Sequence, residues 1–326
     1  MSALRQRSPT TLLLTLDAFN TIFHPRQHVA VQYTQVAKAA GFLSSSVSPE
    51  TVQAAFKSAY KRESASRPNY GRNTPGFGGP REWWANVIRD CFSRVQGKAA
   101  EVNGGSGVMT GQEVPDSLVA ELLQRFEGKE GYAPFEDVEG FFSRLKAWKG
   151  ELEEKGKVGC SGSNHIKRIV VGIISNSDDR ISPILNSLGI SVGSAWADTG
   201  ELLPRGPTST STGGKIKLND IDFIVTSYEA GDEKPHPRIF DIAKTRAKEH
   251  LLATDPSYEE DDSWRRIHIG DDYDHDYQGA TNSGWENFLL LRGGMDYLPG
   301  TNHQTIGSEV KTLRSLNDLY PHLGVK

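Results

Sequence analysis

Apolar residues recur along the chain in two patterns, and the order of the patterns indicates the fold class. Residues 12–16 form a short run that is apolar apart from Thr15. Such a run is typical of a strand buried on both faces of a parallel sheet. Apolar positions 29, 33, 36, 37 and 40 then follow, and their separation of three to four residues predicts a helix.

Between about 25 and 132 the pattern predicts helices and no strand. Residues 29–40 and 81–94 have helical spacing. Ser48 is a good N-cap with Pro49 in the first turn behind it, and Asp116 is expected to cap a further helix. Trp83, Trp84 and Phe56 are expected to pack in the core of this helical block, as most large aromatic residues do.

After Pro134 strands and helices alternate. The expected strands are 169–174, 223–226, 267–269 and 288–291, and the expected helices are 138–148, 181–188 and 238–250. This alternation predicts βαβ units and a parallel sheet. We therefore expect an α/β core of residues 10–24 and 133–326, with 25–132 as a helical insertion after the first strand.

Four stretches are expected to be loops or disordered insertions, because their polar composition buries too little surface to order itself. They are residues 97–114, 151–165, 204–219 and 253–263. A protein partner would find its contacts on such polar insertions.

Composition and charge exclude several classes of function. The chain has 326 residues, 37% of them hydrophobic, which suffices for a large core and a smaller second domain. A net charge of -4 gives no reason to expect nucleic-acid binding, and no apolar run reaches the roughly 18 residues of a membrane span. Two cysteines, Cys91 and Cys160, make no disulfide framework.

We expect a cytoplasmic protein. A mitochondrial location stays open, since Arg5 and Arg7 precede the first strand, and a nuclear location stays open as well.

The candidate chemistry lies in four segments, each at the carboxyl end of an expected strand, where ligands bind in open α/β sheets. The segments are Asp17-Ala18-Phe19-Asn20-Thr21, Ser175-Asn176, Lys234-Pro235 and Gly270-Asp271-Asp272 with Asp276. A carboxylate can attack an electrophile and form a covalent aspartyl intermediate. Asp17 and Asp271 crowded together need a cation, and Mg²⁺ takes oxygen ligands of this kind.

These four segments, in this order, resemble the four motifs of the haloacid dehalogenase-like hydrolase superfamily. Pro68-Asn69-Tyr70-Gly71, Trp83-Trp84 and the segment from Ser175 to Arg180 resemble a eukaryotic branch of it. The resemblance implies a Rossmann-like, doubly wound parallel sheet with strand order 5-4-1-2-3. It also implies that the helical insertion is a small cap over the site.

The resemblance further implies a role for each motif residue. Asp17 would be the nucleophile, and Lys234 would neutralise Asp17 and the substrate. Ser175, with Thr21 and Asn176, would bind the transferred phosphate group of a small phosphorylated substrate.

The metal ligands are implied in the same way. Mg²⁺ would be held by Asp17, Asp271 and the backbone carbonyl of Phe19. Asp272 and Asp276 would complete the outer shell.

One position departs from the pattern of the phosphatases in the superfamily. They carry a second Asp two residues after the nucleophile, as acid and base, and here that residue is Phe19. Loss of a general acid costs roughly 10²–10⁴-fold in rate. Dehalogenases of the superfamily have an aromatic residue there, because a halide leaves without a proton. They work without metal, however, and lack a pair such as Gly270-Asp271.

Three functions stay open at this point. The first is Mg²⁺-dependent hydrolysis or transfer of a phosphoryl group on a small phosphorylated metabolite, weakened by Phe19. The second is a catalytically inactive protein that keeps the fold for binding, and the third is a haloacid dehalogenase-type hydrolase. The otherwise intact motif residues favour the first.

Overall fold

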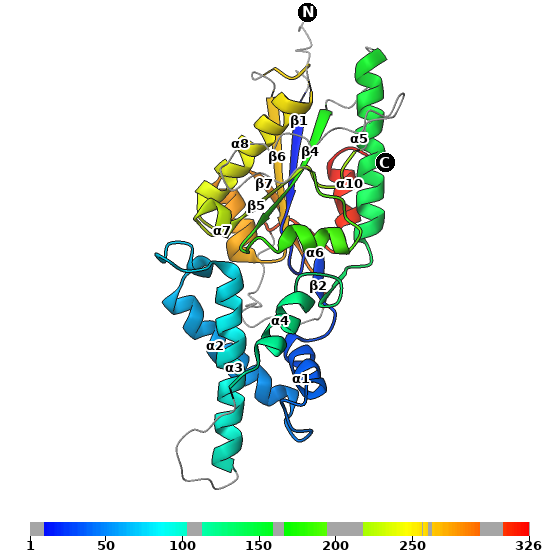
Figure 1. The fold of residues 1–326 in the computed structure, drawn as a ribbon. Coiled ribbons are helices and arrows are strands. Elements are labelled where there is room, and N and C mark those ends of the chain that lie inside the picture. The colour runs from blue at the N-terminus through cyan, green and yellow to red at the C-terminus, as the bar shows by residue number, and fades with distance from the viewer. Residues whose placement is uncertain are drawn as a thin grey trace, which may run out of the picture.

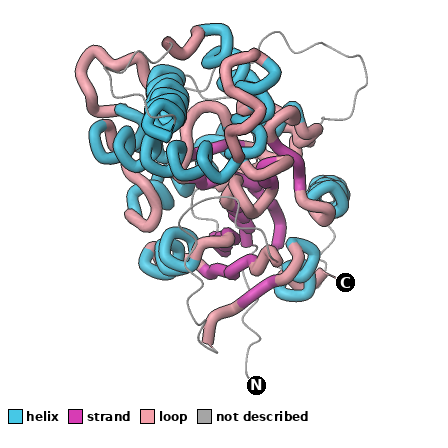
Figure 2. Tube along the Cα trace, turned by 90° about the horizontal axis from the view of Figure 1, so that it is seen from below, coloured by secondary structure: helices cyan, strands magenta, loops and turns pink. Residues whose placement is uncertain are grey.

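The computed structural model of the chain describes residues 10–102, 113–158, 166–193, 218–255, 257–259, 263–293 and 309–325. At its centre is a six-stranded parallel sheet with helices on both sides (Figures 1 and 2). The strands are β1 (Thr10–Leu16), β4 (Ile166–Ser175), β5 (Phe223–Thr226), β6 (Ser263–Gly270), β7 (Glu286–Leu290) and β8 (Thr312–Leu313).

The sheet order is β5-β4-β1-β6-β7-β8. Numbered along the chain within the sheet and read from the other edge, this order is 6-5-4-1-2-3. The predicted order 5-4-1-2-3 is therefore confirmed, with one short strand added at the edge. β1 lies in the interior of the sheet, and Leu16 is paired with Ile173 on one side and Ile269 on the other. This register brings the carboxyl ends of β4, β1 and β6 to the same edge.

Both faces of the sheet are covered, which explains why β1 is apolar on both sides. Leu12, Leu14 and Leu16 belong to one hydrophobic cluster, whereas Leu13 belongs to a second cluster with Phe240. Helix α5 (Val138–Val158) packs on β4 on the side of the first cluster. Helix α8 (Pro237–Thr254) packs on β4 and β5 on the side of the second cluster. Figure 1 shows α5 and α8 on opposite sides of the strands.

The helices of the insertion gather at the carboxyl end of the strands (Figure 1). They are α1 (Val29–Ala39), α2 (Pro49–Ser66), α3 (Pro80–Val102) and α4 (Asp116–Arg125). Ser48 accepts a hydrogen bond from the Thr51 amide and caps α2 as predicted. The predicted cap at Asp116 is wrong: Pro115 precedes the helix, and Asp116 is its first residue. Its carboxylate is instead 2.6 Å from Arg89 of α3.

The remaining helical elements are short. They are η1 (Asn69–Gly71), α6 (Ile181–Ser187), α7 (Ser227–Ala230), η2 (Tyr273–Gln278), α9 (Gly279–Asn282), η3 (Leu316–Asp318) and α10 (Leu319–His322). Among all helices in the described ranges, none combines the length and apolarity that crossing a membrane requires.

A two-stranded antiparallel ribbon joins the insertion to the core, and the sequence pattern does not predict it. Its strands are β2 (Phe23–Pro25) and β3 (Tyr132–Pro134). Phe23 pairs with Pro134, and Pro25 with Tyr132. With three residues in each strand, the ribbon is too short for an alternating pattern to show.

The predicted loops are wrong in part. Helix α3 continues to Val102, α5 to Val158 and α8 to Thr254, and β6 already begins at Ser263. The polar composition of these helix ends led to the prediction of loops. Glu and Lys are good helix formers, however, and extend a helix that has begun. Residues 103–112, 159–165, 204–217, 256 and 260–262 of the predicted loops lie outside the described residues.

A buried ion pair fastens α5 to the start of β5 and generates a stability prediction. Lys149 Nζ is 2.9 and 2.8 Å from the two carboxylate oxygens of Asp222, and both side chains are almost wholly buried. Lys149→Met leaves the carboxylate buried without its cation, so we expect a loss of about 3–5 kcal/mol in urea unfolding. Lys146→Met is the control: Lys146 pairs with Asp220 at 2.7 Å but is 38% exposed, so its loss should stay below about 1 kcal/mol. Equal effects of the two substitutions would contradict the prediction.

Candidate active site

Asp17 is the first residue after β1, and its backbone is fixed to the neighbouring strand. Its amide donates a hydrogen bond of 2.8 Å to the carbonyl of Ile269 in β6. The chain then turns tightly: Ile22 N–H donates to Ala18 O at 2.9 Å, and Asn20 adopts a left-handed φ of 54°. The carboxylate of Asp17 is therefore held at the edge of the sheet, with 7% of the residue exposed.

Lys234 is buried and lies between two carboxylates. Its Nζ donates to Asp17 Oδ1 at 2.6 Å, to Asp276 Oδ1 at 2.6 Å and to the carbonyl of Ile174 at 2.8 Å. The backbone of Lys234 is bound by the Asn176 side chain, whose Oδ1 accepts from Lys234 N–H at 2.6 Å and whose Nδ2 donates to Lys234 O at 2.9 Å. Asn176, predicted to bind substrate, thus uses its amide group to position Lys234.

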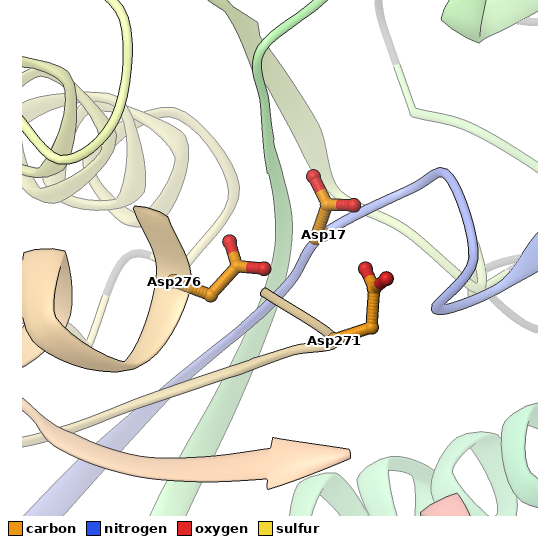
Figure 3. A group of neighbouring side chains, drawn as sticks. All are labelled: Asp17, Asp271 and Asp276. Atoms are coloured by element: carbon orange, nitrogen blue, oxygen red, sulfur yellow. The ribbon is translucent and has the colours of Figure 1, made fainter. Parts of the chain in front are cut away.

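Three carboxylates lie close together at this edge (Figure 3). Asp17, Asp271 and Asp276 each offer an oxygen atom within 4.8 Å of the others. Burial, with the nearby charge of Asp276, raises the pKa of Asp17 to about 6 despite the Lys234 ammonium. Burial and the charge of Asp17 hold the pKa of Asp271 well above its usual range. Three carboxylates facing one ammonium leave an excess of negative charge, so the group fits a divalent cation.

Asp276 lies deeper in the site than predicted. Burial would raise its pKa, but Lys234 and the hydrogen bond from His268 outweigh burial and hold the pKa low. His268 Nε2 is 3.1 Å from Asp276 Oδ1, and its Nδ1 is 2.9 Å from Thr15 Oγ1. A Cβ atom at Gly270 would lie 2.1 Å from the Asp276 carboxyl group. Glycine is therefore needed at 270, because Asp276 fills that space.

The side chain of Asp272 is bonded to His275 and is not part of the triad. Its Oδ1 accepts from the amide of His275 at 2.8 Å and lies 3.2 Å from the His275 ring. Of the two residues expected in the outer shell, Asp276 is part of the triad, whereas Asp272 caps the turn that follows.

The other predicted residues surround the triad. Thr21 is buried, and its hydroxyl donates to Asp271 Oδ1 at 3.4 Å. Ser175 is the last residue of β4 and is 1% exposed. The ring of Phe19 packs edge-on against Phe23 and Tyr132, with centroid distances of 4.8 and 5.6 Å. The roles predicted for Thr21, Ser175 and the Phe19 carbonyl stay predictions.

A cavity of about 230 Å³ begins at Phe19 and Asn176 and extends between the core and the helices of the insertion. Most of its wall is aromatic or aliphatic. Phe56 and Trp83 belong to the hydrophobic core as predicted, and Trp84 packs against it. Phe56 and Trp84 also line the cavity. Its mostly apolar and aromatic lining is typical of a small-molecule site.

A charged cluster missed at the level of sequence closes one side of the cavity. Arg180 donates through Nε and Nη2 to the two oxygens of Asp178, both at 2.8 Å. Trp84 of α3 donates to the same carboxylate at 2.8 Å, and its ring lies 4.4 Å below the guanidinium carbon. This cluster joins the segment after β4 to the insertion. The sequence signal was the polar run after Asn176, which gave no hint of Trp84 as partner.

Comparisons with known proteins find relatives that match most of the chain. No protein-family model matches the chain. Haloacid dehalogenase-like hydrolase domain-containing protein 3 of Bos taurus is 28% identical over 312 residues, which cover 95% of this chain and 93% of the relative. The chain is therefore similar to a haloacid dehalogenase-like hydrolase over nearly its whole length. Uncharacterized protein YMR130W of Saccharomyces cerevisiae is 26% identical over 287 residues, covering 86% of this chain and 72% of the relative.

A solved structure has a similar fold. 2-Haloacid dehalogenase from Pseudomonas syringae pv. Tomato DC3000 superimposes with a TM-score of 0.50 and 16% sequence identity, over 96% of this chain and 98% of that chain. The predicted Rossmann-like α/β fold is confirmed.

The buried carboxylates predict how the stability of the metal-free protein depends on pH. The pKa of Asp17 rises from 3.8 to about 6 on folding, so the folded state holds this proton more tightly than the unfolded state. The stabilisation is complete below pH 3.8 and is lost as the pH rises through about 6. It corresponds to about 3 kcal/mol. We expect urea unfolding in EDTA to show this decline, and Asp17→Asn to remove much of it.

Asp272→Asn is the control for this titration. The pKa of Asp272 is lowered, because its bonds to His275 outweigh burial. Its contribution to stability therefore changes only below the ordinary pKa of 3.8. The decline should persist in Asp272→Asn, and an equal decline in Asp17→Asn would contradict the assignment to Asp17.

Proposed function

We propose that the protein hydrolyses a small phosphorylated metabolite through an aspartyl phosphate at Asp17, with Mg²⁺ as cofactor. The observation that supports this proposal is the placement of Asp17 at the end of β1, bonded to Lys234 and beside Asp271 and Asp276. A nucleophilic carboxylate, a fixed ammonium and a carboxylate group for a cation are the components that phosphoryl transfer requires.

The residues present fit a divalent cation. Asp17, Asp271 and Asp276 supply three oxygen-bearing groups and face one buried ammonium. We propose that Asp17 and Asp271, with the Phe19 carbonyl, hold Mg²⁺, and that Asp276 supports them. When bound, Mg²⁺ supplies positive charge that stabilises the negative oxygens of a transferring phosphoryl group.

The chain's own residues would act in two steps. An oxygen of Asp17 attacks phosphorus, the bond from phosphorus to the ester oxygen breaks, and the leaving group departs with the electron pair. Water then attacks the aspartyl phosphate, which releases phosphate and restores the carboxylate. Lys234 holds one Asp17 oxygen at 2.6 Å and so orients the other. Ser175 and Thr21, both buried at this edge, are proposed to bind the phosphoryl oxygens.

The insertion is proposed to act as a cap. Its helices lie over the carboxyl ends of the strands (Figure 1), and its residues line the cavity beside the nucleophile. Residues 25–132 would then exclude water from the reaction and select the substrate.

A second candidate is dehalogenation of a small acid through Asp17, and the aromatic side chain of Phe19 favours it. Release of chloride from 2-chloropropionate in the presence of EDTA would support this reaction. The pair Gly270-Asp271, which dehalogenases of the superfamily lack, is why phosphoryl transfer is preferred.

The proposed intermediate can be trapped. Incubated with acetyl phosphate and Mg²⁺ and quenched in acid, the protein should carry one phosphoryl group on the peptide that contains Asp17, as seen by mass spectrometry. Asp17→Asn should lose the adduct and reduce turnover at least about a thousandfold, because no carboxylate remains to attack. Beryllium fluoride with Mg²⁺ should raise the melting temperature of the wild type only.

Asp241→Asn is the matched control, since this carboxylate of α8 is 69% exposed and pairs with Lys244. Its adduct and turnover should equal those of the wild type. An adduct that survives in Asp17→Asn, or forms equally in EDTA, would rule out the proposed mechanism.

A further inference from the structure

The cavity that Phe19 lines, two residues after Asp17, has an aromatic wall. Of the 15 residues that line it, eight are aromatic: Phe19, Tyr33, Phe56, Tyr60, Tyr70, Trp84, Phe126 and Tyr132. Aromatic rings prefer edge-to-face and offset contacts with other rings. A cavity of about 150 Å³ is large enough for benzene, so about 230 Å³ accommodates a ring with substituents or a fused pair of rings.

The charge in this cavity is already neutralised. Arg180 is the one cation among the lining residues, and its guanidinium is bonded to both oxygens of Asp178. Burial raises the pKa of Tyr132 to about 12 and that of Tyr70 well above its usual range, so both phenols stay protonated. The cavity therefore suits a neutral group better than a second phosphate or a carboxylate.

Phe19 belongs both to the cavity wall and to the segment that carries Asp17. It lines the cavity and stands two residues after Asp17, and the lining residues include no Asp, Glu or His. No carboxylic acid in this wall can protonate the departing oxygen. A phenol has a pKa near 10 and leaves as phenolate, whereas an alcohol resembles water, whose pKa is about 15.7, and needs a proton.

From these two observations we infer that the substrate is an aryl phosphate whose ring occupies the aromatic cavity. The inference rests on the proposed phosphoryl transfer at Asp17. The bond from Asp17 oxygen to phosphorus forms while the bond from phosphorus to the aryl oxygen breaks. The electron pair stays on the aryl oxygen, and the phenolate takes its proton from solvent after it is released. Because a phenolate leaves without a proton, such a substrate does not need the general acid that is missing at Phe19.

Three substrates test the inference. Phenyl phosphate has the ring and an acidic leaving group, cyclohexyl phosphate has a similar size but an alcohol leaving group, and acetyl phosphate has an acidic leaving group without a ring. We expect kcat/KM for phenyl phosphate to exceed that for cyclohexyl phosphate by at least about 10²-fold. Phe19→Asp should narrow this ratio by raising the cyclohexyl rate, because a carboxylic acid then stands at the leaving oxygen.

Binding gives a second readout that needs no turnover. 1-Naphthol should bind to the Asp17→Asn protein and compete with phenyl phosphate in the wild type. Tyr60→Arg places a charge in the cavity wall at a residue that is 37% exposed, and it should weaken naphthol binding at least about tenfold. Leu252→Arg is the control, since Leu252 of α8 is 56% exposed and does not line the cavity.

The outcomes separate the inference from the proposed function. Hydrolysis of acetyl phosphate with no preference for the aryl ester would overturn the inference alone, as would naphthol binding that Tyr60→Arg leaves unchanged. Failure of all three phosphates would overturn the proposed function and the inference with it.

Discussion

The buried ammonium of Lys234 is the group on which the site depends. Asp17 and Asp276 each place an oxygen 2.6 Å from it, and Asp271 lies beside them. Carboxylates buried this closely repel one another and lose hydration, so they require a cation of matched geometry. The order β4-β1-β6 supplies that geometry, because it brings the carbonyl of Ile174 and the carboxylates to one edge.

The surroundings of Lys234 show how the fold keeps this arrangement in place. Asn176, the residue after β4, forms two hydrogen bonds with the backbone of Lys234. His268 of β6 forms a hydrogen bond with Asp276. Gly270 leaves the space that the Asp276 carboxyl group fills. The ends of the strands position the residues of the site, and hydrogen bonds with neighbouring polar groups orient their side chains. The site is therefore a product of the sheet register rather than of any one loop.

Part of this could be predicted from the sequence, because the central strands of the sheet are long enough for their pattern to show. Asp17 at the end of an apolar run follows from such a pattern, whereas the strand order was implied by the resemblance to the superfamily. The ribbon at Phe23 and the pairing of Trp84 with Asp178 do not, since three-residue strands carry no period and partners distant in sequence need coordinates. The sequence analysis assigned the polar ends of α3 and α5 to loops, because polarity alone does not distinguish a loop from an exposed helix.

The ribbon β2–β3 has a consequence for how this protein could have diversified. Because Phe23 pairs with Pro134, the chain leaves the core and returns to it at neighbouring points. An insertion whose two ends meet can be lengthened, shortened or exchanged while the sheet keeps its connectivity. The carboxylate site in the core and the cavity wall in the insertion can therefore evolve as separate modules, so that one can change while the other is retained.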